Sequence, residues 1–318
     1  MSSFAIIAGA QGGVELPLEA AIDRLDGAVL GWLHLHGISE ETRALLGERL
    51  GLPDLVVGAL TAVETRPRCD GIGDGALINL RARAPDRATD ADALVSIRVW
   101  TQRGRIVSVA RYDIDGLDRM RAAMLAGRVR DPGDFVAMLA DAITDDLDPR
   151  VAALGDMLDD CELMLDARRA FALRRDIARV RAEAIEYRRF VAPQRQALER
   201  LAALDCAWLE NDDRLHLRES ADRFARMTEE LESIRERAAL TSEQITDLRA
   251  ELLDTRSLWI SIVALIFLPL TFLTGLLGMN VEGIPYAREP WAFWGVVGVC
   301  AALAAGTFAW FMRSRWLR

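Results

Sequence analysis

The pattern of apolar and polar positions predicts an α/β domain at the start of the chain. Short apolar runs bounded by turn residues are typical of strands, and we expect strands at 4–9, 28–36, 60–65, 76–84, 93–101 and 105–110. The last two should pair across the Gln102-Arg103-Gly104 turn. Ser39 followed by two acids predicts a helix N-terminus, and 116–130 and 134–147 have helical patterns.

Beyond residue 143 the pattern becomes continuously helical. We expect one helix at 146–166, a second at 167–204 and a third that begins at Asn211-Asp212-Asp213. The third contains no Pro or Gly before Pro269. If it ends near Leu277, it is on the order of 100 Å long.

One register of this third helix is apolar at every seventh residue: Leu217, Phe224, Leu231, Ala238, Ile245 and Leu252. Such a repeat indicates a sustained packing seam. The seam packs either against the second helix of the same chain or against other copies around a symmetry axis. The frequency of helical hairpins favours packing within the chain.

Two long segments near the C-terminus contain no charged residue. Residues 257–281 and 291–312 are 25 and 22 residues long, enough to cross about 30 Å of hydrocarbon. Arginines flank the pair on its outer ends, whereas the loop between the segments contains only Arg288. The positive-inside rule therefore predicts cytoplasmic termini and an external loop.

These patterns predict a fold of the α+β class joined to a membrane domain. We expect a cytoplasmic α/β domain at 1–143 and a cytoplasmic helical hairpin with a stalk helix at 144–256. A first transmembrane helix should occupy 257–281 and an external loop 282–290. A second transmembrane helix at 291–312 and a basic cytoplasmic tail at 313–318 complete the prediction.

Charge and motif spacing exclude several functional classes. The net charge is −9, and the residues after Arg256 contribute +2, so the preceding part carries −11, which argues against nucleic-acid binding. The glycines of 69–75 lack the spacing of a nucleotide-binding loop and suit a hairpin turn. No catalytic triad or metal-hydrolase spacing is evident, so the sequence does not predict an enzyme.

The first apolar segment has one small and polar face. Its members recur at three- and four-residue steps: Asp254, Ser257, Ser261, Ala264, Leu268, Thr271, Gly275 and Gly278. Small residues allow close packing of helices in membranes, which is one explanation. The other is a water-filled pore, which two helices cannot enclose and which therefore requires a symmetric oligomer.

The segment from Pro269 to Asn280, which reads PLTFLTGLLGMN, resembles the CorA metal-ion transporter family. Gly278-Met279-Asn280 matches the Gly-Met-Asn signature of this family, before a short loop and a second span that ends in basic residues. The cytoplasmic runs 190–195 and 208–218 and the loop 281–285 are most similar to its zinc-transporting ZntB branch. The similarity is strong from about Leu147 onward and extends to the N-terminal domain only in general layout.

The resemblance implies a funnel-shaped homopentamer in the inner membrane, with the long helix lining a central pore. Gly278, Met279 and Asn280 would form the selectivity filter for a hydrated cation. The pore would be lined by Asp254, Ser257, Ser261, Ala264, Leu268, Thr271 and Gly275. Glu282 departs from the family pattern; it would attract cations outside the filter or pair with Arg288.

The transported ion is not fixed by the residues. The apolar segments contain no His, so zinc would pass hydrated, and no tightly bound cofactor is expected. Zn²⁺ transport, passive or coupled to protons, is the main hypothesis. A Mg²⁺ or Co²⁺ channel is the alternative, and a membrane-anchored sensor that transports nothing is a third. His34, His36 and His216 are weak candidates for a separate metal site.

Overall fold

The computed structural model describes residues 3–9, 12–63, 66–84, 94–166, 170–279, 284 and 289–313. The chain divides into two compact units. The first contains Met1–Leu165 and Phe171–Ser242, and the second contains Asp166–Ala170 and Glu243–Arg318. One long helix, Asn211–Leu277, contributes to both units.

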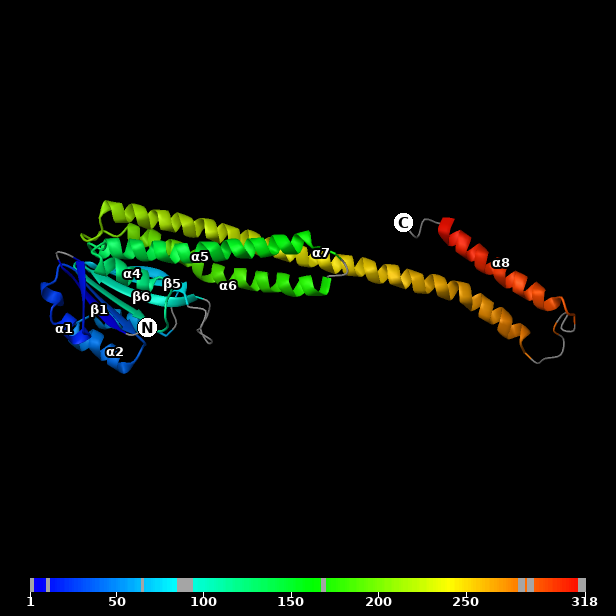
Figure 1. Ribbon diagram of the computed structural model, residues 1–318, viewed down its shortest axis with the longest axis horizontal. Helices are drawn as coiled ribbons and strands as arrows, with labels where there is room; N and C mark the ends of the chain where they lie inside the picture. Colours follow the sequence, from blue (N-terminus) through cyan, green and yellow to red (C-terminus); the bar gives the residue numbers. More distant parts are fainter. Residues whose placement is uncertain are drawn as a thin grey trace. The chain divides into compact units, whose positions relative to one another are not determined.

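The first unit contains a seven-stranded sheet of order β2-β1-β3-β7-β6-β5-β4 (Figure 1). Among the described strands, β3 and β7 pair in parallel and the other neighbours pair antiparallel. The strands are β1 (Phe4–Gly9), β2 (Gly12–Leu16), β3 (Gly31–His36), β4 (Arg68–Ile72), β5 (Gly75–Arg83), β6 (Leu94–Gln102) and β7 (Arg105–Ala110). The fold class expected from the sequence, an α/β domain with a long helix and a C-terminal helix, is confirmed.

Short helices cover one face of this sheet. They are α1 (Leu18–Ile22), the single 3-10 turn η1 (Leu25–Gly27), α2 (Glu40–Ala44), the π-helix η2 (Leu45–Arg49) and α3 (Asp54–Leu60). Their apolar side chains bury the strand residues Leu33, Trp100 and Val107. The expected serine cap is present, because Ser39 Oγ accepts the N–H of Thr42 at 3.1 Å.

The other face packs against α4 (Leu117–Leu125) and α5 (Pro132–Leu163). The rings of Trp32 on β3 and Phe135 on α5 meet edge to face at 4.9 Å. Helix α4 is shorter than the expected 116–130, because Gly127 adopts a φ of 70° and ends the turn that follows the helix. The sheet is thus a central layer with helices on both faces.

Several local predictions are corrected. Of the strand expected at 60–65, the described residues 60–63 form no strand: Leu60 ends α3, where Val56, Val57 and Leu60 are spaced to face the core together. The expected strand 28–36 begins only at Gly31. The sequence reasoning missed β2 and β4, although β4 pairs with β5 through the hairpin turn expected within 69–75, where Gly73 has a φ of 58°.

The two helices expected at 134–147 and 146–166 are one helix, α5, which continues through Pro149. Proline removes one backbone hydrogen bond and frees the carbonyl four residues earlier. Pro149 is exposed, so water can satisfy that carbonyl. The buried positions Leu147, Val151 and Leu154 continue on both sides of it and hold the helix against its neighbours.

Helices α6 (Ala170–Ala202) and α7 (Asn211–Leu277) complete the helical part. Within the first unit, α7 packs against both α5 and α6. Arg223 pairs with Asp145 and Asp148 on α5 at 2.9 and 2.8 Å, and Arg188 of α6 pairs with Glu232 of α7 at 2.6 Å. The seven-residue seam residues Leu217, Phe224, Leu231 and Ala238 are fully buried. The seam therefore packs within the chain, as expected.

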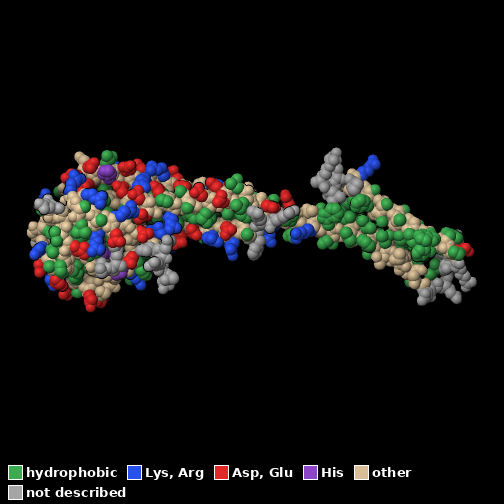
Figure 2. Space-filling model, viewed as in Figure 1, with side chains coloured by type: hydrophobic (Ala, Val, Ile, Leu, Met, Phe, Trp, Pro, Cys, Tyr) green, Lys and Arg blue, Asp and Glu red, His purple; other side chains and the backbone are tan. Residues whose placement is uncertain are grey.

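The second unit contains the C-terminal part of α7 and α8 (Ala292–Arg313). Among the described residues, these two helices contain segments long and apolar enough to cross a membrane. Hydrophobic side chains gather over both segments, whereas acidic and basic side chains cover the first unit (Figure 2). Nearly all of the apolar surface in the second unit is exposed, as a lipid-facing surface requires.

The seam generates a stability prediction. Replacing Phe224, which is 0% exposed, with Ala should lower the free energy of unfolding by about 3–5 kcal/mol, because a cavity forms between α7 and its neighbours. The matched control Leu240→Ala lies on the same helix at 60% exposure and should cost under about 0.5 kcal/mol. Denaturant unfolding of the purified chain measures both. Equal effects would contradict intrachain packing.

Candidate functional site

The membrane-spanning part of α7 has two opposite faces. One face is a stripe of half-buried positions at three- and four-residue steps around the buried Ile262: Leu258, Ile262, Ile266, Leu270, Leu273 and Leu277. Helix α8 has a matching stripe: Ala292, Val296, Cys300, Ala304, Thr307 and Phe311. At 100° per residue, the small and polar series noted in the sequence lies on the other side of α7 from its apolar stripe. The intrachain packing of the spans therefore leaves the polar face free.

Every residue of the polar face is exposed within the chain. This holds for Asp254, Ser257, Ser261, Ala264, Leu268, Thr271 and Gly275. Leu268, at 74% exposure, is the largest apolar group among them. The Thr271 hydroxyl donates to the Phe267 carbonyl at 2.8 Å, so its oxygen lone pairs remain available as acceptors. The face offers neutral oxygens and one carboxylate, which suits a hydrated cation.

The end of the first span is set by a glycine. Helix α7 ends at Leu277, and the Gly278 N–H donates to the Thr274 carbonyl at 2.9 Å. A Cβ at position 278 would lie 2.9 Å from that carbonyl oxygen, which is closer than side chains tolerate. Met279 is 49% exposed. Asn280 and Glu282, the remaining residues expected at this end, lie outside the described residues.

The polar series also continues, in the same seven-residue phase, along the exposed face of the part of α7 that precedes the membrane segment, which was not noted in the sequence. Counting back from Asp254 in three- and four-residue steps reaches seven exposed charged residues: Asp247, Glu243, Glu236, Glu229, Arg226, Asp222 and Glu219. All but Arg226 are acidic. We call these residues the acidic stripe. Its phase was readable in the sequence, but only the burial of the opposite seam shows that no described element of the chain covers this face.

His34, one of the three weak candidates for a metal site, is buried in the core beside the sheet. It is 1% exposed, and its Nδ1 lies 2.9 Å from Ser108 Oγ, which accepts the Trp32 indole N–H at 2.8 Å. The His34 ring is therefore hydrogen-bonded within the core. Burial lowers the pKa of His34 to about 3, so the ring is neutral at physiological pH.

The other two histidines lie on different elements. His36 Nδ1, at the end of β3, is 3.8 Å from Asp113. His216 Nε2, in the first turns of α7, is 3.9 Å from Asp212. Within the part of the chain that the structure describes, no group of three potential metal ligands includes a histidine. The separate histidine metal site stays a prediction without geometric support.

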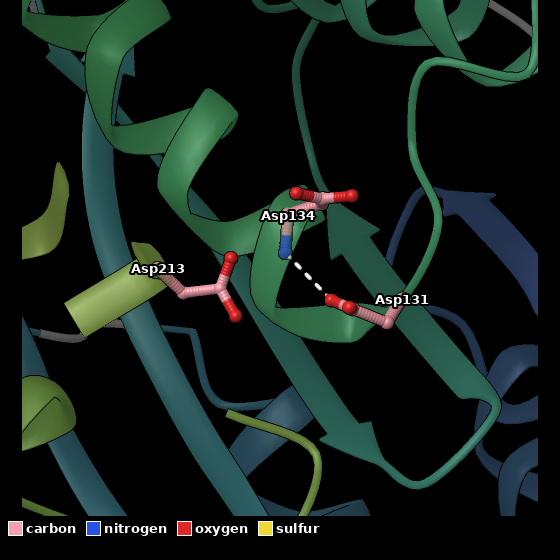
Figure 3. Close-up of side chains that lie close together, drawn as sticks. All are labelled: Asp131, Asp134 and Asp213. Atoms are coloured by element: carbon pink, nitrogen blue, oxygen red, sulfur yellow. Dashed lines mark hydrogen bonds between the residues drawn. The ribbon is translucent and has the colours of Figure 1, made fainter. Parts of the chain in front are cut away.

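Three carboxylates do come together, at the start of α5 and α7 (Figure 3). One oxygen each of Asp131, Asp134 and Asp213 lies within 4.8 Å of the others. Asp131 accepts the N–H of Asp134 at 2.8 Å as the cap of α5, and Asp134 pairs with Arg130 at 2.7 Å. Asp213 is 2% exposed and accepts the N–H of Glu210 at 2.9 Å. Each carboxylate thus stabilises a local turn or helix start.

Similarity to known proteins identifies the family of this chain. The model of the family described as CorA-like Mg²⁺ transporter protein matches residues 27–313. The chain belongs to this CorA-like transporter family. Its members are transporters rather than enzymes.

Relatives and solved structures agree with this membership. The zinc transport protein ZntB of Pectobacterium atrosepticum is 33% identical over 287 residues, which are 90% of this chain and 88% of the relative. ZntB of Klebsiella pneumoniae is 34% identical over 99% of this chain and 95% of its own. The structure of full-length CmaX has a TM-score of 0.78 at 29% identity, over 99% and 98% of the two chains.

The fold likeness extends beyond close relatives. The structure of the CorA magnesium transporter from Methanocaldococcus jannaschii has a TM-score of 0.82 and covers 100% of this chain and 99% of its own. At 16% identity it supports the CorA fold alone. The chain belongs to the CorA-like family and has two helices that are long and apolar enough to span a membrane. It is therefore a membrane transporter of divalent cations.

Asp213 generates a pH prediction. Burial and the neighbouring Asp131 and Asp134 raise its pKa to about 6, against 3.8 when unperturbed, although the Glu210 N–H opposes this. Because the folded pKa exceeds the unfolded one, the folded state takes up a proton as pH falls from about 7.5 to 5, and stability rises. Between about pH 7.5 and 5, the free energy of unfolding of the wild type should rise by about 1 kcal/mol more than that of Asp213→Asn. Parallel pH profiles of unfolding would contradict the assignment.

Proposed function

We propose that the chain transports Zn²⁺ across the inner membrane through a pore that five copies form around a common axis. The observation that carries the proposal is the exposed polar face of α7, which no described part of the chain covers. Exposed serine, threonine and aspartate side chains are unfavourable toward lipid. A shared, water-filled axis gives this face a polar environment.

The acidic stripe supports the same arrangement. It continues the phase of the polar face, so a helix that turns one face toward the axis brings both to it. Six acidic residues and one arginine per copy would give the lumen a strongly negative potential. Such a potential raises the local concentration of divalent cations within a Debye length of about 8 Å.

The filter in this proposal is Gly278, Met279 and Asn280. An amide oxygen coordinates the water shell of a cation without a full charge that would trap the ion. Glu282 would add a ring of carboxylates outside the filter and raise the local concentration of cations. Leu268 would form an apolar constriction that gates by excluding water.

Zinc is favoured over magnesium or cobalt by the ZntB relatives, which cover about nine-tenths of the chain or more. The polar face contains no imidazole or thiol, and Cys300 belongs to the half-buried stripe of α8. Zinc would therefore pass with its water shell, and no tightly bound cofactor is needed. Proton coupling would use Asp254 or Glu282, because these are the carboxylates at the two ends of the span. The flanking arginines favour, by the positive-inside rule, cytoplasmic termini.

Flux into liposomes that contain the purified full chain tests the proposal. Zinc should enter, faster when a pH gradient is imposed, and more rapidly than magnesium. Asn280→Ala should remove the preference for zinc while the mass of the assembly stays that of five chains. Thr274→Ala is the matched control, because the Thr274 hydroxyl donates only to the backbone of its own helix, at 2.9 Å to Leu270 and 3.2 Å to Thr271.

Three results would contradict specific parts of the proposal. Magnesium flux driven by voltage alone would make the chain a magnesium channel. Wild-type selectivity in Asn280→Ala would remove the filter assignment. The absence of flux for both ions would favour a membrane-anchored sensor.

A further inference from the structure

Helices α5 and α6 flank the acidic stripe of α7 on opposite sides, and the three helices run side by side in the first unit (Figure 1). At about 100° per residue, Arg223 and Arg237, which pair with α5, lie on one side of the stripe. Glu232, which pairs with α6, lies on the other side. A ring of copies that turns every stripe toward its axis therefore places α5 of one copy next to α6 of the following copy.

The exposed side of α5 is acidic. One series on this side recurs at three- and four-residue steps: Pro149, Ala153, Asp156, Asp160 and Leu163. All its members are exposed, and Leu163 exposes 85% of its surface. Asp156 and Asp160 pair with no arginine in the described part of the chain. We call this series the acidic face of α5.

The exposed side of α6 has the opposite charge and a similar spacing. Its series, again at three- and four-residue steps, is Arg174, Ala178, Arg181, Ile185 and Arg189. All its members are exposed, and Ile185 exposes 48% of its surface. Among the described residues, none of the three arginines pairs with a carboxylate. We call this series the basic face of α6.

Ion pairs within the chain fix the height of each face along α7. Helix α5 runs parallel to α7, because Asp145 pairs with Arg223 and Asp159 with Arg237. Helix α6 runs antiparallel to α7, and its Arg188 pairs with Glu232. Positions on α5 and α6 can therefore be compared through the residues of α7 that lie level with them.

The two faces lie at the same height. Asp160 follows the residue that pairs with Arg237, and Arg181 lies seven residues before Arg188, so both are level with residues 238–239 of α7. One turn away, Asp156 and Arg189 lie within about 5 Å of a common height. Rotation about an axis along α7 preserves heights, so each aspartate can meet its arginine on the neighbouring copy.

We propose that the acidic face of α5 docks onto the basic face of α6 of the next copy of this chain, with Asp160 paired to Arg181 and Asp156 to Arg189. The partner is a second copy because the two faces match in charge, spacing and height. Each copy offers one face of each kind, so the contact is heterologous and closes in a ring. The contact also covers Leu163 and Ile185. The inference rests on the ring of the proposed function and adds the surface that joins neighbours in it.

Cysteine cross-linking of the full chain in membranes tests the contact, in a background without the four native cysteines. After mild oxidation, chains with both Asp160→Cys and Arg181→Cys should form ladders of up to five chains on denaturing gels. Either single variant alone should stay monomeric, and the two single variants co-expressed should give dimers only. Arg179→Cys with Asp160→Cys is the matched control and should stay monomeric. Arg179 is also exposed but, two residues from Arg181, lies on the opposite side of α6.

Charge reversal tests whether the pairs are electrostatic. In the double-cysteine chain, Arg189→Glu should lower the cross-linking yield several-fold at low salt, because an acid then faces Asp156. Adding Asp156→Arg should restore the yield. Both differences should vanish near 1 M salt, where the Debye length is about 3 Å. All the substituted residues are exposed, so the variants should fold.

The mass of the assembly before oxidation separates this inference from the proposed pore. Five chains that give no cross-link between positions 160 and 181 would overturn the docking surface and leave the pore intact. A monomeric mass would contradict both. Equal cross-linking through positions 179 and 181, or yields that do not respond to charge reversal, would also overturn the docking surface.

Discussion

The architecture depends on how the surface of α7 is divided. One seven-residue series is apolar and buried against α5 and α6 within the first unit, and Leu217, Phe224 and Leu231 have no exposed surface. The burial of these side chains provides the main stabilisation of the helical part. Because the seam occupies one side of the helix, the other side stays exposed among the residues that the structure describes. The acidic stripe lies on this free side.

The membrane segment repeats this division with different chemistry. Its apolar stripe and the stripe of α8 account for the half-buried positions, and the small and polar residues are left exposed. In water an exposed serine needs no explanation, but in a lipid bilayer it does. The same helix therefore needs an external partner for its free face in the membrane, and a symmetric assembly of copies satisfies this need. Membership of the CorA-like family is consistent with that requirement.

Much of this organisation was predictable from the sequence because long periodic patterns are informative. The start of α7 at Asn211 and its end at Leu277 follow from its acidic first turn and from the Gly278 that succeeds it. Strands β1 and β7 have the expected limits. Short elements were harder, because Val56, Val57 and Leu60 fit a buried helix turn or a strand equally well. The division into helices at 134–147 and 146–166 was wrong; the single helix also continues through Pro149, since a proline on the exposed side of a packed helix need not end it.

The candidate sites show a similar limit. The polar face of the span was readable as a periodic set, whereas the group formed by Asp131, Asp134 and Asp213 was not, because it joins residues about 80 positions apart. Arg98 likewise looked like an ordinary polar position in a strand. Only the three-dimensional structure shows that it is buried opposite Asn79. Sequence patterns locate surfaces better than they locate contacts between distant segments.

The central claim, that the polar face of α7 meets its equivalents in other copies, is tested most directly by disulfide cross-linking. In a background without Cys69, Cys161, Cys206 and Cys300, a single cysteine would replace Ser261 or, as the control, Val263, which is exposed on a different side of the same helix turn. After mild oxidation in the membrane, the Ser261→Cys chains should form covalent dimers and the Val263→Cys chains should remain monomeric on denaturing gels. Cross-linking through position 263 but not through position 261 would contradict the account.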